Sequence, residues 1–249
     1  MWTDASIEAV FFDAGNTLLR VHPSVGAVYA EKAAGFGVHV EAEVLDGSFR
    51  AAWRARAALP GTTPAVTNEA AERAWWRAIV VDTFTRAGAF EAFGDRFDAF
   101  FGGLFAHFAG PEPWAVYEDV FPALETLQAR GVAMAIVSNW DSRLPSLVER
   151  LGLAPYMRFA LTSAQAGTPK PHRGIFEEAL RRMGRPADVV AHVGDEPLAD
   201  GQGAADAGLW PILVDRRGKL SHPAGAPVIT TLRDLPGMLV PRETSPGRS

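Results

Sequence analysis

The fold is decided by residues 7–17, which read IEAVFFDAGNT. Residues 7–12 are apolar and rich in β-formers, and the chain then breaks at residues 13–17, Asp-Ala-Gly-Asn-Thr. This pattern predicts a buried strand that runs into a tight loop. A continuously apolar strand is typical of a parallel sheet that is covered on both faces.

The same strand-then-loop pattern returns four times further along the chain. It covers residues 132–137, 158–161, 189–193 and 211–214. Helical stretches lie between these strands, for example at residues 122–130, 143–151, 175–183 and 198–207. Strands that alternate with helices predict an α/β fold with a doubly wound parallel sheet.

The segment from Val21 to Ala109 has helical patterns and no strand pattern. Its phenylalanines recur at helical spacing, at positions 93, 97, 100, 101, 105 and 108. Such a stripe predicts the core of a helix bundle rather than a cofactor site. We therefore expect an α/β core at residues 1–19 and 114–240, an inserted all-helical cap at 20–113 and a flexible tail at 241–249.

Composition excludes several classes of protein. Of the 249 residues, 48% are hydrophobic and 21% charged, as in a globular protein. The 24 basic and 29 acidic residues form no basic surface, so we expect no nucleic-acid partner. No apolar run is long enough for a membrane span and no signal peptide is evident, which predicts a cytoplasmic protein. Without cysteine, thiol catalysis and thiolate metal sites are excluded.

Polar residues follow the predicted strands. In chain order they are Asp13 and Thr17, Ser138 and Asn139, Lys170, and the pair Asp195 and Asp200. Ligands of open parallel sheets bind at the carboxyl ends of the strands. We therefore expect these residues to form one site.

The residue types define the chemistry of that site. Asp13 can serve as a carboxylate nucleophile. Ser138 can bind an anion, and Lys170 can neutralise the substrate or the carboxylates. Asp195 and Asp200, beside Asp13, would create a hard oxygen site that suits Mg²⁺.

Each of these residues also has a simpler interpretation. An aspartate after a strand is usually a helix cap or a turn former, and Asp13 considered without the other residues would be interpreted in this way. Asp200 can likewise be only the cap of its helix, so it ranks below Asp195 as a candidate ligand. Ser138 and Asn139 can cap the helix that follows them. We expect Glu196 to be solvated rather than a ligand.

With these residues in this order, the chain resembles the haloacid dehalogenase-like hydrolase superfamily. The resemblance is to the branch that has a helical cap inserted after the first motif, the loop that carries the nucleophile. Asp13 to Thr17 matches the nucleophile loop, Ser138 the hydroxyl motif and Lys170-Pro171 the lysine motif. Gly194-Asp195 through Asp200 matches the acidic motif.

The resemblance implies a Rossmann-like core, a mobile cap and, usually, hydrolysis of a small phosphate monoester. It implies that Asp13 and Lys170 are catalytic and that Ser138, Asn139, Thr17 and Gly15 bind the substrate. It also implies a Mg²⁺ ion held by Asp13, Asp195, Asp200 and the backbone carbonyl of Gly15.

One position departs from the family pattern. Phosphatases of the family carry a second aspartate two residues after the nucleophile as general acid and base, and here that residue is Gly15. A positioned acid–base is typically worth about 10²–10⁴-fold in rate. His22 or His172 could supply the proton instead, although neither lies two residues from the nucleophile. Trp140 either lines the substrate pocket or braces the loop.

Three alternatives therefore stay open. Family members that cleave carbon–halogen bonds also lack the second aspartate, but they usually lack the acidic motif and carry an early cap arginine, where this chain has Val44 and, further on, Arg50. Members that cleave carbon–phosphorus bonds need a cap lysine, and the cap has only Lys32. The third alternative is a catalytically impaired protein that binds a phosphorylated ligand. The sequence indicates neither the substrate nor the oligomeric state.

Overall fold

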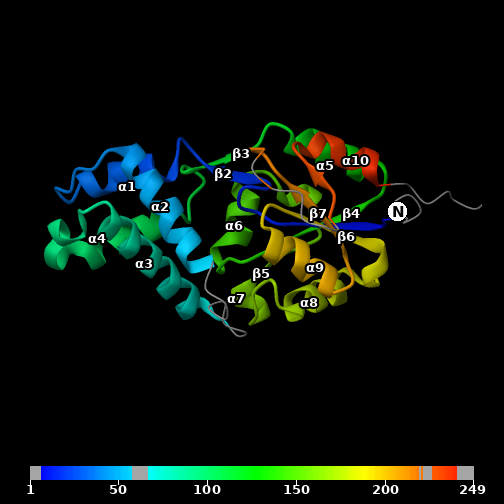
Figure 1. Cartoon of the computed structure of the whole chain (residues 1–249). Helices are drawn as coiled ribbons and strands as arrows, with labels where there is room; N and C mark the ends of the chain where they lie inside the picture. The colour runs from blue at the N-terminus through cyan, green and yellow to red at the C-terminus, as the bar shows by residue number, and fades with distance from the viewer. Residues whose placement is uncertain (1–6, 58–66, 219, 221–225, 240–249) are drawn as a thin grey trace, which may run out of the picture.

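The protein is described by a computed structural model that covers residues 7–57, 67–218, 220 and 226–239 (Figure 1). Six parallel strands form the main sheet in the order β5-β4-β1-β6-β7-β8. In chain order they are β1 (Ala9–Phe12), β4 (Ala133–Ser138), β5 (Ala160–Thr162), β6 (Val190–Gly194), β7 (Trp210–Val214) and β8 (Val228–Ile229). The predicted α/β fold with a doubly wound parallel sheet is confirmed.

Alternate residues of the central strand β1 point to opposite faces of the sheet. Val10 and Phe12 join one hydrophobic core, and Ala9 and Phe11 join another. All four side chains are fully buried, which explains why the strand is continuously apolar in sequence.

Helices cover both faces of the sheet. The first core contains residues of α5 (Val120–Ala129), α6 (Arg143–Arg150) and α10 (Leu235–Met238), and the second contains residues of α8 (Arg173–Met183) and α9 (Gly203–Asp206). In Figure 1, α5 and α10 lie above the sheet and α7 (Ser163–Ala166), α8 and α9 below it.

A helical insert lies between the first two sheet strands of the chain. It consists of α1 (Val25–Ala34), α2 (Ala42–Ala57), α3 (Glu69–Arg86), the 3₁₀ helix η1 (Phe90–Arg96) and α4 (Phe97–His107). Its entrance and exit are joined by a small antiparallel sheet of β2 (Leu19–Val21) and β3 (Trp114–Val116). The insert sits at one end of the main sheet (Figure 1).

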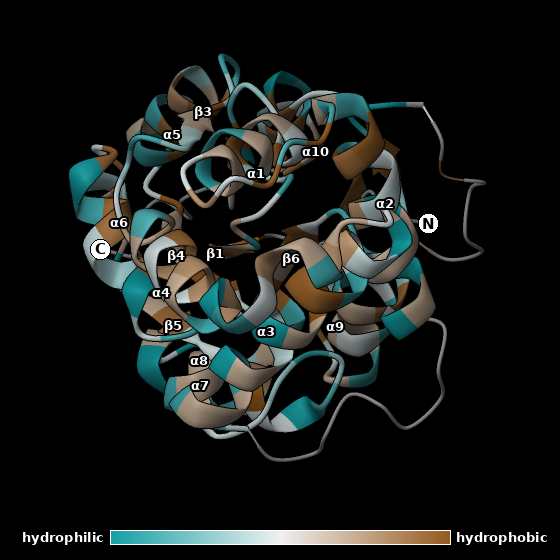
Figure 2. Cartoon of the chain, turned by 90° about the vertical axis from the view of Figure 1, so that its left-hand side faces the viewer, coloured by the Kyte–Doolittle hydropathy of each residue, from teal (hydrophilic) through white to brown (hydrophobic). Residues whose placement is uncertain are grey.

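The predicted phenylalanine stripe is the core of this insert. Phe93, Phe97, Phe100 and Phe101 are buried together, with Phe105 and Phe108 packed against them. Figure 2, which views the molecule from the side of the insert, shows hydrophilic residues along the outer faces of the helices. The exact limits of core and cap stay predictions, and the predicted tail at 241–249 lies outside the described residues.

The structure differs from the sequence prediction in three places. The sequence did not predict the small antiparallel sheet of β2 and β3, and it did not predict the edge strand β8. The helix expected at residues 198–207 is instead a wide π-type turn, η4 (Pro197–Gln202), followed by the short helix α9, and this difference places Asp200 inside the site. Within the described ranges, every helix is too short or too polar to cross a lipid bilayer.

Candidate active site

The sheet order brings the predicted polar residues together. Strand β1 lies between β4 and β6, and the three strands run parallel. Asp13 follows β1, Ser138 ends β4 and Asp195 follows β6. The carboxyl ends of adjacent parallel strands meet at one edge of the sheet, where such folds bind their ligands.

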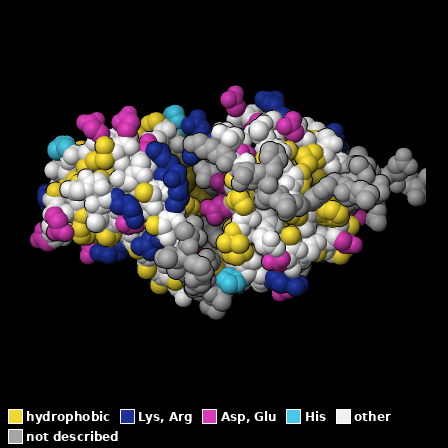
Figure 3. Space-filling model, in the orientation of Figure 1, with side chains coloured by type: hydrophobic (Ala, Val, Ile, Leu, Met, Phe, Trp, Pro, Cys, Tyr) yellow, Lys and Arg dark blue, Asp and Glu magenta, His cyan; other side chains and the backbone are white. Residues whose placement is uncertain are grey.

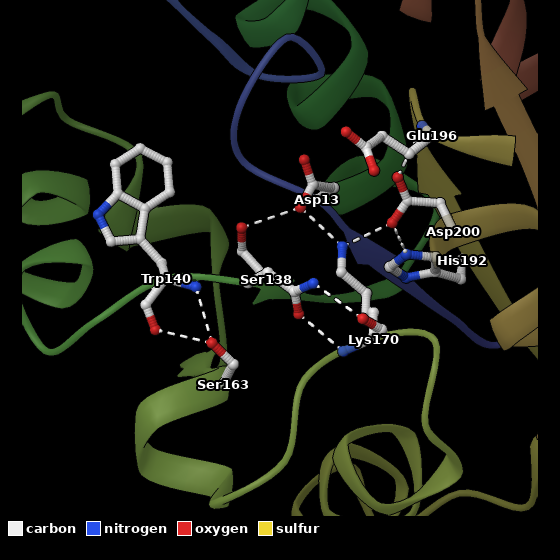
Figure 4. Close-up of polar contacts among 9 residues, drawn as sticks. Asp13, Ser138, Trp140, Ser163, Lys170, His192, Glu196 and Asp200 are labelled. Carbon is white, nitrogen blue, oxygen red and sulfur yellow. Dashed lines mark hydrogen bonds and ion pairs between the residues drawn. The ribbon is translucent and has the colours of Figure 1, made fainter. Parts of the chain in front are cut away.

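A buried ammonium group joins two of the carboxylates (Figure 4). The Nζ atom of Lys170 donates to Oδ1 of Asp13 at 2.7 Å and to Oδ1 of Asp200 at 2.5 Å. The hydroxyl of Ser138 donates to the same Asp13 oxygen at 2.9 Å. Lys170 is 2% exposed, so this ion pair is shielded from water.

The charges around Lys170 fix its protonation state. Burial by itself would lower the pKa of Lys170, but the charges of Asp13 and Asp200 outweigh burial and raise it. Burial likewise would raise the pKa of Asp200, whereas Lys170 and His192 lower it, and the net shift is downward. The lysine is therefore a fixed cation, and Asp200 is a fixed anion.

Asn139 holds the lysine loop in place. Its Nδ2 donates to the backbone carbonyl of Lys170 at 2.9 Å, and the backbone N–H of Lys170 donates to its Oδ1 at 2.7 Å. Both amide atoms of Asn139 thus bond to the lysine backbone. This side chain positions Lys170, and its expected contact with a substrate stays a prediction.

Asp200 has more contacts than the sequence indicated. Besides Lys170, its Oδ1 contacts Nε2 of His192 at 2.9 Å, and its Oδ2 accepts a hydrogen bond from the backbone N–H of Glu196 at 3.0 Å. A Cβ atom at Gly194 would clash with the Asp200 carboxylate, so only glycine permits this approach. The interpretation of Asp200 as a mere helix cap is wrong.

Three carboxylates form an oxygen cluster. One oxygen from each of Asp13, Asp195 and Asp200 lies within 4.8 Å of the others. Burial, together with the charges of Asp13 and Asp200, raises the pKa of Asp195 well above its usual range. Burial also raises the pKa of Asp13. Such crowding of anions around one ammonium group favours the binding of a cation.

The loop after β1 leaves open space at Gly15. A Cβ atom there would have one neighbour within 4 Å, the ring of Trp140 at 3.9 Å. Asn16 has the left-handed backbone conformation in this loop, with φ of 53°, whereas Gly15 does not have a positive φ. A side chain at position 15 is therefore compatible with the loop.

Thr17 lies at the end of this loop and is fully buried. Its hydroxyl has no hydrogen-bond partner among the described residues, whereas its carbonyl accepts hydrogen bonds from Arg216. The expected contact of Thr17 with a substrate stays a prediction.

Two residues near the site were missed or misread in the sequence. His192, which the sequence patterns above do not single out, is fully buried against Asp200, and burial lowers its pKa, which favours the neutral ring. Glu196 accepts a hydrogen bond from the indole N–H of Trp53 in α2 at 3.1 Å, and burial raises its pKa. Glu196 is thus half-buried and hydrogen-bonded rather than fully solvated, and the expectation that it is not a ligand stays a prediction. His22, in contrast, is exposed, and its ring lies next to Arg20.

The insert packs over this end of the sheet. Glu72 in α3 accepts a hydrogen bond from the Ser163 hydroxyl at 2.6 Å, and Arg143 in α6 donates to the carbonyl of Phe105 in α4 at 2.6 Å. Figure 3 shows acidic side chains at the bottom of a hollow between the two parts, with basic side chains on the insert side. A ligand in this hollow would contact both parts.

Comparison with known proteins agrees with this arrangement. The haloacid dehalogenase-like hydrolase family matches residues 7–208. Human haloacid dehalogenase-like hydrolase domain-containing protein 3 is 36% identical over 211 residues, which are 84% of this chain and 82% of that protein. The chain belongs to the haloacid dehalogenase-like hydrolase family and is a hydrolase of that family.

Solved structures of two kinds share the fold. A haloacid dehalogenase-like phosphatase from Thermococcus onnurineus aligns with a TM-score of 0.64 at 20% identity, covering 94% of this chain and 98% of that one. A 2-haloacid dehalogenase from Pseudomonas syringae aligns with a TM-score of 0.59 at 29% identity, with the same coverage. Because both activities occur among these relatives, the chemistry of the site must distinguish them.

Proposed function

We propose that this protein is a Mg²⁺-dependent phosphatase that hydrolyses a small phosphorylated metabolite through Asp13. The observation that supports this proposal is the buried Lys170 ammonium between Asp13 and Asp200, beside the three-carboxylate cluster. Lys170 and Ser138 both bond to Oδ1 of Asp13. No described residue donates to Oδ2, which is therefore the oxygen available for attack.

The reaction would proceed in two displacements. Oδ2 of Asp13 attacks the phosphorus atom, and the bond from phosphorus to the leaving alcohol breaks. Water then attacks the same phosphorus atom, which releases phosphate and restores the Asp13 carboxylate. Ser138, Asn139, Thr17 and Gly15 complete the proposed phosphate site.

The residues present fit a Mg²⁺ ion. Its ligands would be the carboxylates of Asp13, Asp195 and Asp200 and the backbone carbonyl of Gly15, all hard oxygen donors. The Asp195 carboxylate has no hydrogen-bond or ion-pair partner among the described residues, in contrast to Asp200. When bound, Mg²⁺ supplies positive charge between the anionic nucleophile and an anionic substrate.

The alternatives have less support in the site. A dehalogenase has no need of the Asp195 and Asp200 carboxylates as metal ligands, because its leaving group is a halide. A carbon–phosphorus hydrolase would need a lysine from the insert, but Lys32 lies in the last turn of α1 and pairs with Glu31 at 3.0 Å. A cytoplasmic location and the absence of a nucleic-acid partner stay predictions.

A phosphate-release screen tests the proposal. Wild-type protein is incubated with a panel of phosphorylated metabolites and aryl phosphates, with Mg²⁺ or with a chelator. We expect phosphate release that requires the metal. Halide release from haloacids would instead support a dehalogenase, and cleavage of phosphonates would support a carbon–phosphorus hydrolase. Binding of a panel compound without any turnover would support the impaired binding protein.

Replacing Asp195 by Asn should stabilise the metal-free protein and remove its stabilisation by Mg²⁺. The raised pKa of Asp195 means that its ionisation costs stability in the folded state. As the pH rises from about 4 through the raised pKa, metal-free wild type should therefore lose more stability than the variant. At about 100 times its Kd, Mg²⁺ adds about 2.7 kcal/mol to wild type, or roughly 5–10 °C in melting temperature.

Thermal melts with and without Mg²⁺ measure both effects. The matched control is Asp95→Asn, because Asp95 is exposed and lies in the insert. The control should respond to Mg²⁺ as wild type does. An equal Mg²⁺ shift in Asp195→Asn and wild type would show that Asp195 is not a ligand.

A further inference from the structure

Strand β6 carries a polar side chain into the interior of the sheet. Its residues read Val-Ala-His-Val-Gly and are all buried, so His192 lies among apolar neighbours. In the sheet register, His192 pairs with Phe11 of β1 on one side and with Pro211 of β7 on the other. A buried polar group costs free energy unless it is hydrogen-bonded, so an imidazole at this position needs a partner.

The partner of the imidazole is the carboxylate of Asp200 (Figure 4). Nε2 of His192 lies 2.9 Å from Oδ1 of Asp200, whereas Nδ1 has no hydrogen-bond partner among the described residues. The ring of Phe176 in α8 packs against the imidazole, with ring centroids 5.2 Å apart and an angle of 85° between the two planes. Close packing on both sides of the strand therefore fixes the ring with Nε2 toward Asp200.

The geometry defines which ring nitrogen carries the proton. An ionised carboxylate only accepts hydrogen bonds, so Nε2 must carry the N–H that bonds to Asp200. A ring protonated at Nδ1 alone would turn a lone pair toward the carboxylate. It would also leave a buried N–H without an acceptor, which is costly. The arrangement therefore favours the Nε2–H tautomer, in which His192 donates to Oδ1 of Asp200.

Asp200 depends on side-chain contacts for its orientation. It lies in the wide π-type turn η4 rather than in a regular α-helix. The ammonium group of Lys170, which also bonds to Oδ1, is a compact charge with three rotatable donors and imposes little direction. The imidazole of His192 is rigid and donates along one line. His192 therefore determines which way the Asp200 carboxylate faces.

The orientation of Asp200 affects the nucleophile through Lys170. The same ammonium group donates to Oδ1 of Asp200 and to Oδ1 of Asp13, so the two carboxylates compete for it. The N–H of His192 stabilises part of the negative charge on Oδ1 of Asp200 and so weakens its attraction for the ammonium group. Without that N–H, Lys170 would shift toward Asp200 and away from Asp13.

We infer that His192 is a positioning residue of the active site, whose Nε2–H holds the Asp200 carboxylate so that Lys170 stays on Asp13. It acts through Asp200 and is itself neither a metal ligand nor a catalytic residue. The same hydrogen bond keeps the Asp200 carboxylate in the three-carboxylate cluster, where the proposed function places Mg²⁺. The inference rests on that proposed function, but two of its three measurements need no phosphatase activity.

Nitrogen-15 NMR of the histidine side chains tests the position of the proton. The chain has six histidines, and the signals of His192 are those that disappear in His192→Gln. We predict a proton on Nε2 in the metal-free wild type. An Nε2 without a proton would overturn the inference, because such a ring cannot donate to Asp200, and it would leave the phosphatase proposal standing.

Three variants separate a positioning role from packing. In His192→Gln the amide nitrogen can reach the place of Nε2, whereas in the matched control His192→Asn it reaches only the place of Nδ1. His192→Leu fills the space without a donor. We expect the Asn and Leu variants to lose about 10- to 100-fold in Mg²⁺ affinity and in kcat, the usual cost of removing the partner of a metal ligand. His192→Gln should keep most of both, and KM should change little.

Calorimetry measures the Mg²⁺ affinity, phosphate release at saturating Mg²⁺ measures kcat and KM, and thermal melts identify variants that fail to fold. A purely structural role predicts that Leu is tolerated best, because a buried amide costs stability. If His192→Leu does not fold, Gln and Asn give the same comparison. Equal Mg²⁺ affinity with and without the donor would overturn the inference. Mg²⁺ affinities that follow the donor in a protein that releases no phosphate would support it and contradict the proposed function alone.

Discussion

Replacing Gly15 by Asp should raise the rate of alkyl phosphate hydrolysis by up to about 10²–10⁴-fold, the range of a restored general acid–base. An alkoxide leaves poorly without a proton, and at the proposed site Gly15 supplies none. Wild type should therefore hydrolyse an aryl phosphate slowly and an alkyl phosphate barely. The gain for the aryl substrate should be smaller, because a phenolate needs the proton least.

The structure favours a folded Gly15→Asp variant. Gly15 is outside the left-handed region, and a Cβ there meets Trp140 at 3.9 Å. The control is Gly15→Asn, which has nearly the same size and no acid. Steady-state rates for one alkyl and one aryl phosphate measure the effect. A folded, Mg²⁺-binding Gly15→Asp protein without an alkyl gain, or an equal gain in Gly15→Asn, would contradict the missing-acid explanation.

Replacing Asp13 by Asn should lower kcat by at least about 10⁴-fold, because loss of a nucleophile removes the covalent route. The amide keeps an oxygen that can accept from Lys170 and Ser138, so the fold should survive. Asp95→Asn serves again as the exposed control. Phosphate release and a thermal melt of each protein measure activity and folding. A folded Asp13→Asn variant with wild-type activity would exclude Asp13 as the nucleophile.

The sheet was predictable because its strands are encoded locally. Each is a run of apolar residues that ends in a loop, and parallel packing forces the carboxyl ends together. Asp13, Ser138 and Lys170 could therefore be placed in one site from their order alone. The contact of Lys170 with Asp13 spans 157 positions in sequence, yet the topology implies it.

Other features depend on contacts that no local pattern records. The hydrogen bond between Trp53 and Glu196 spans 143 positions and joins the insert to the core. The pair of hydrogen bonds between the Asn139 amide and the Lys170 backbone depends on how two loops meet. Strands β2 and β3 have three residues each and owe their pairing to the insert between them.

The central claim is that Asp13 carries the phosphoryl group between the two displacements. Because Gly15 supplies no base to activate water, the aspartyl phosphate should persist long enough to be trapped. Wild-type enzyme is mixed with para-nitrophenyl phosphate and Mg²⁺, quenched in acid within the first turnovers and digested for mass spectrometry. We predict one phosphoryl group on the peptide that contains Asp13. Turnover without that group on Asp13, together with undiminished turnover in Asp13→Asn, would contradict the account.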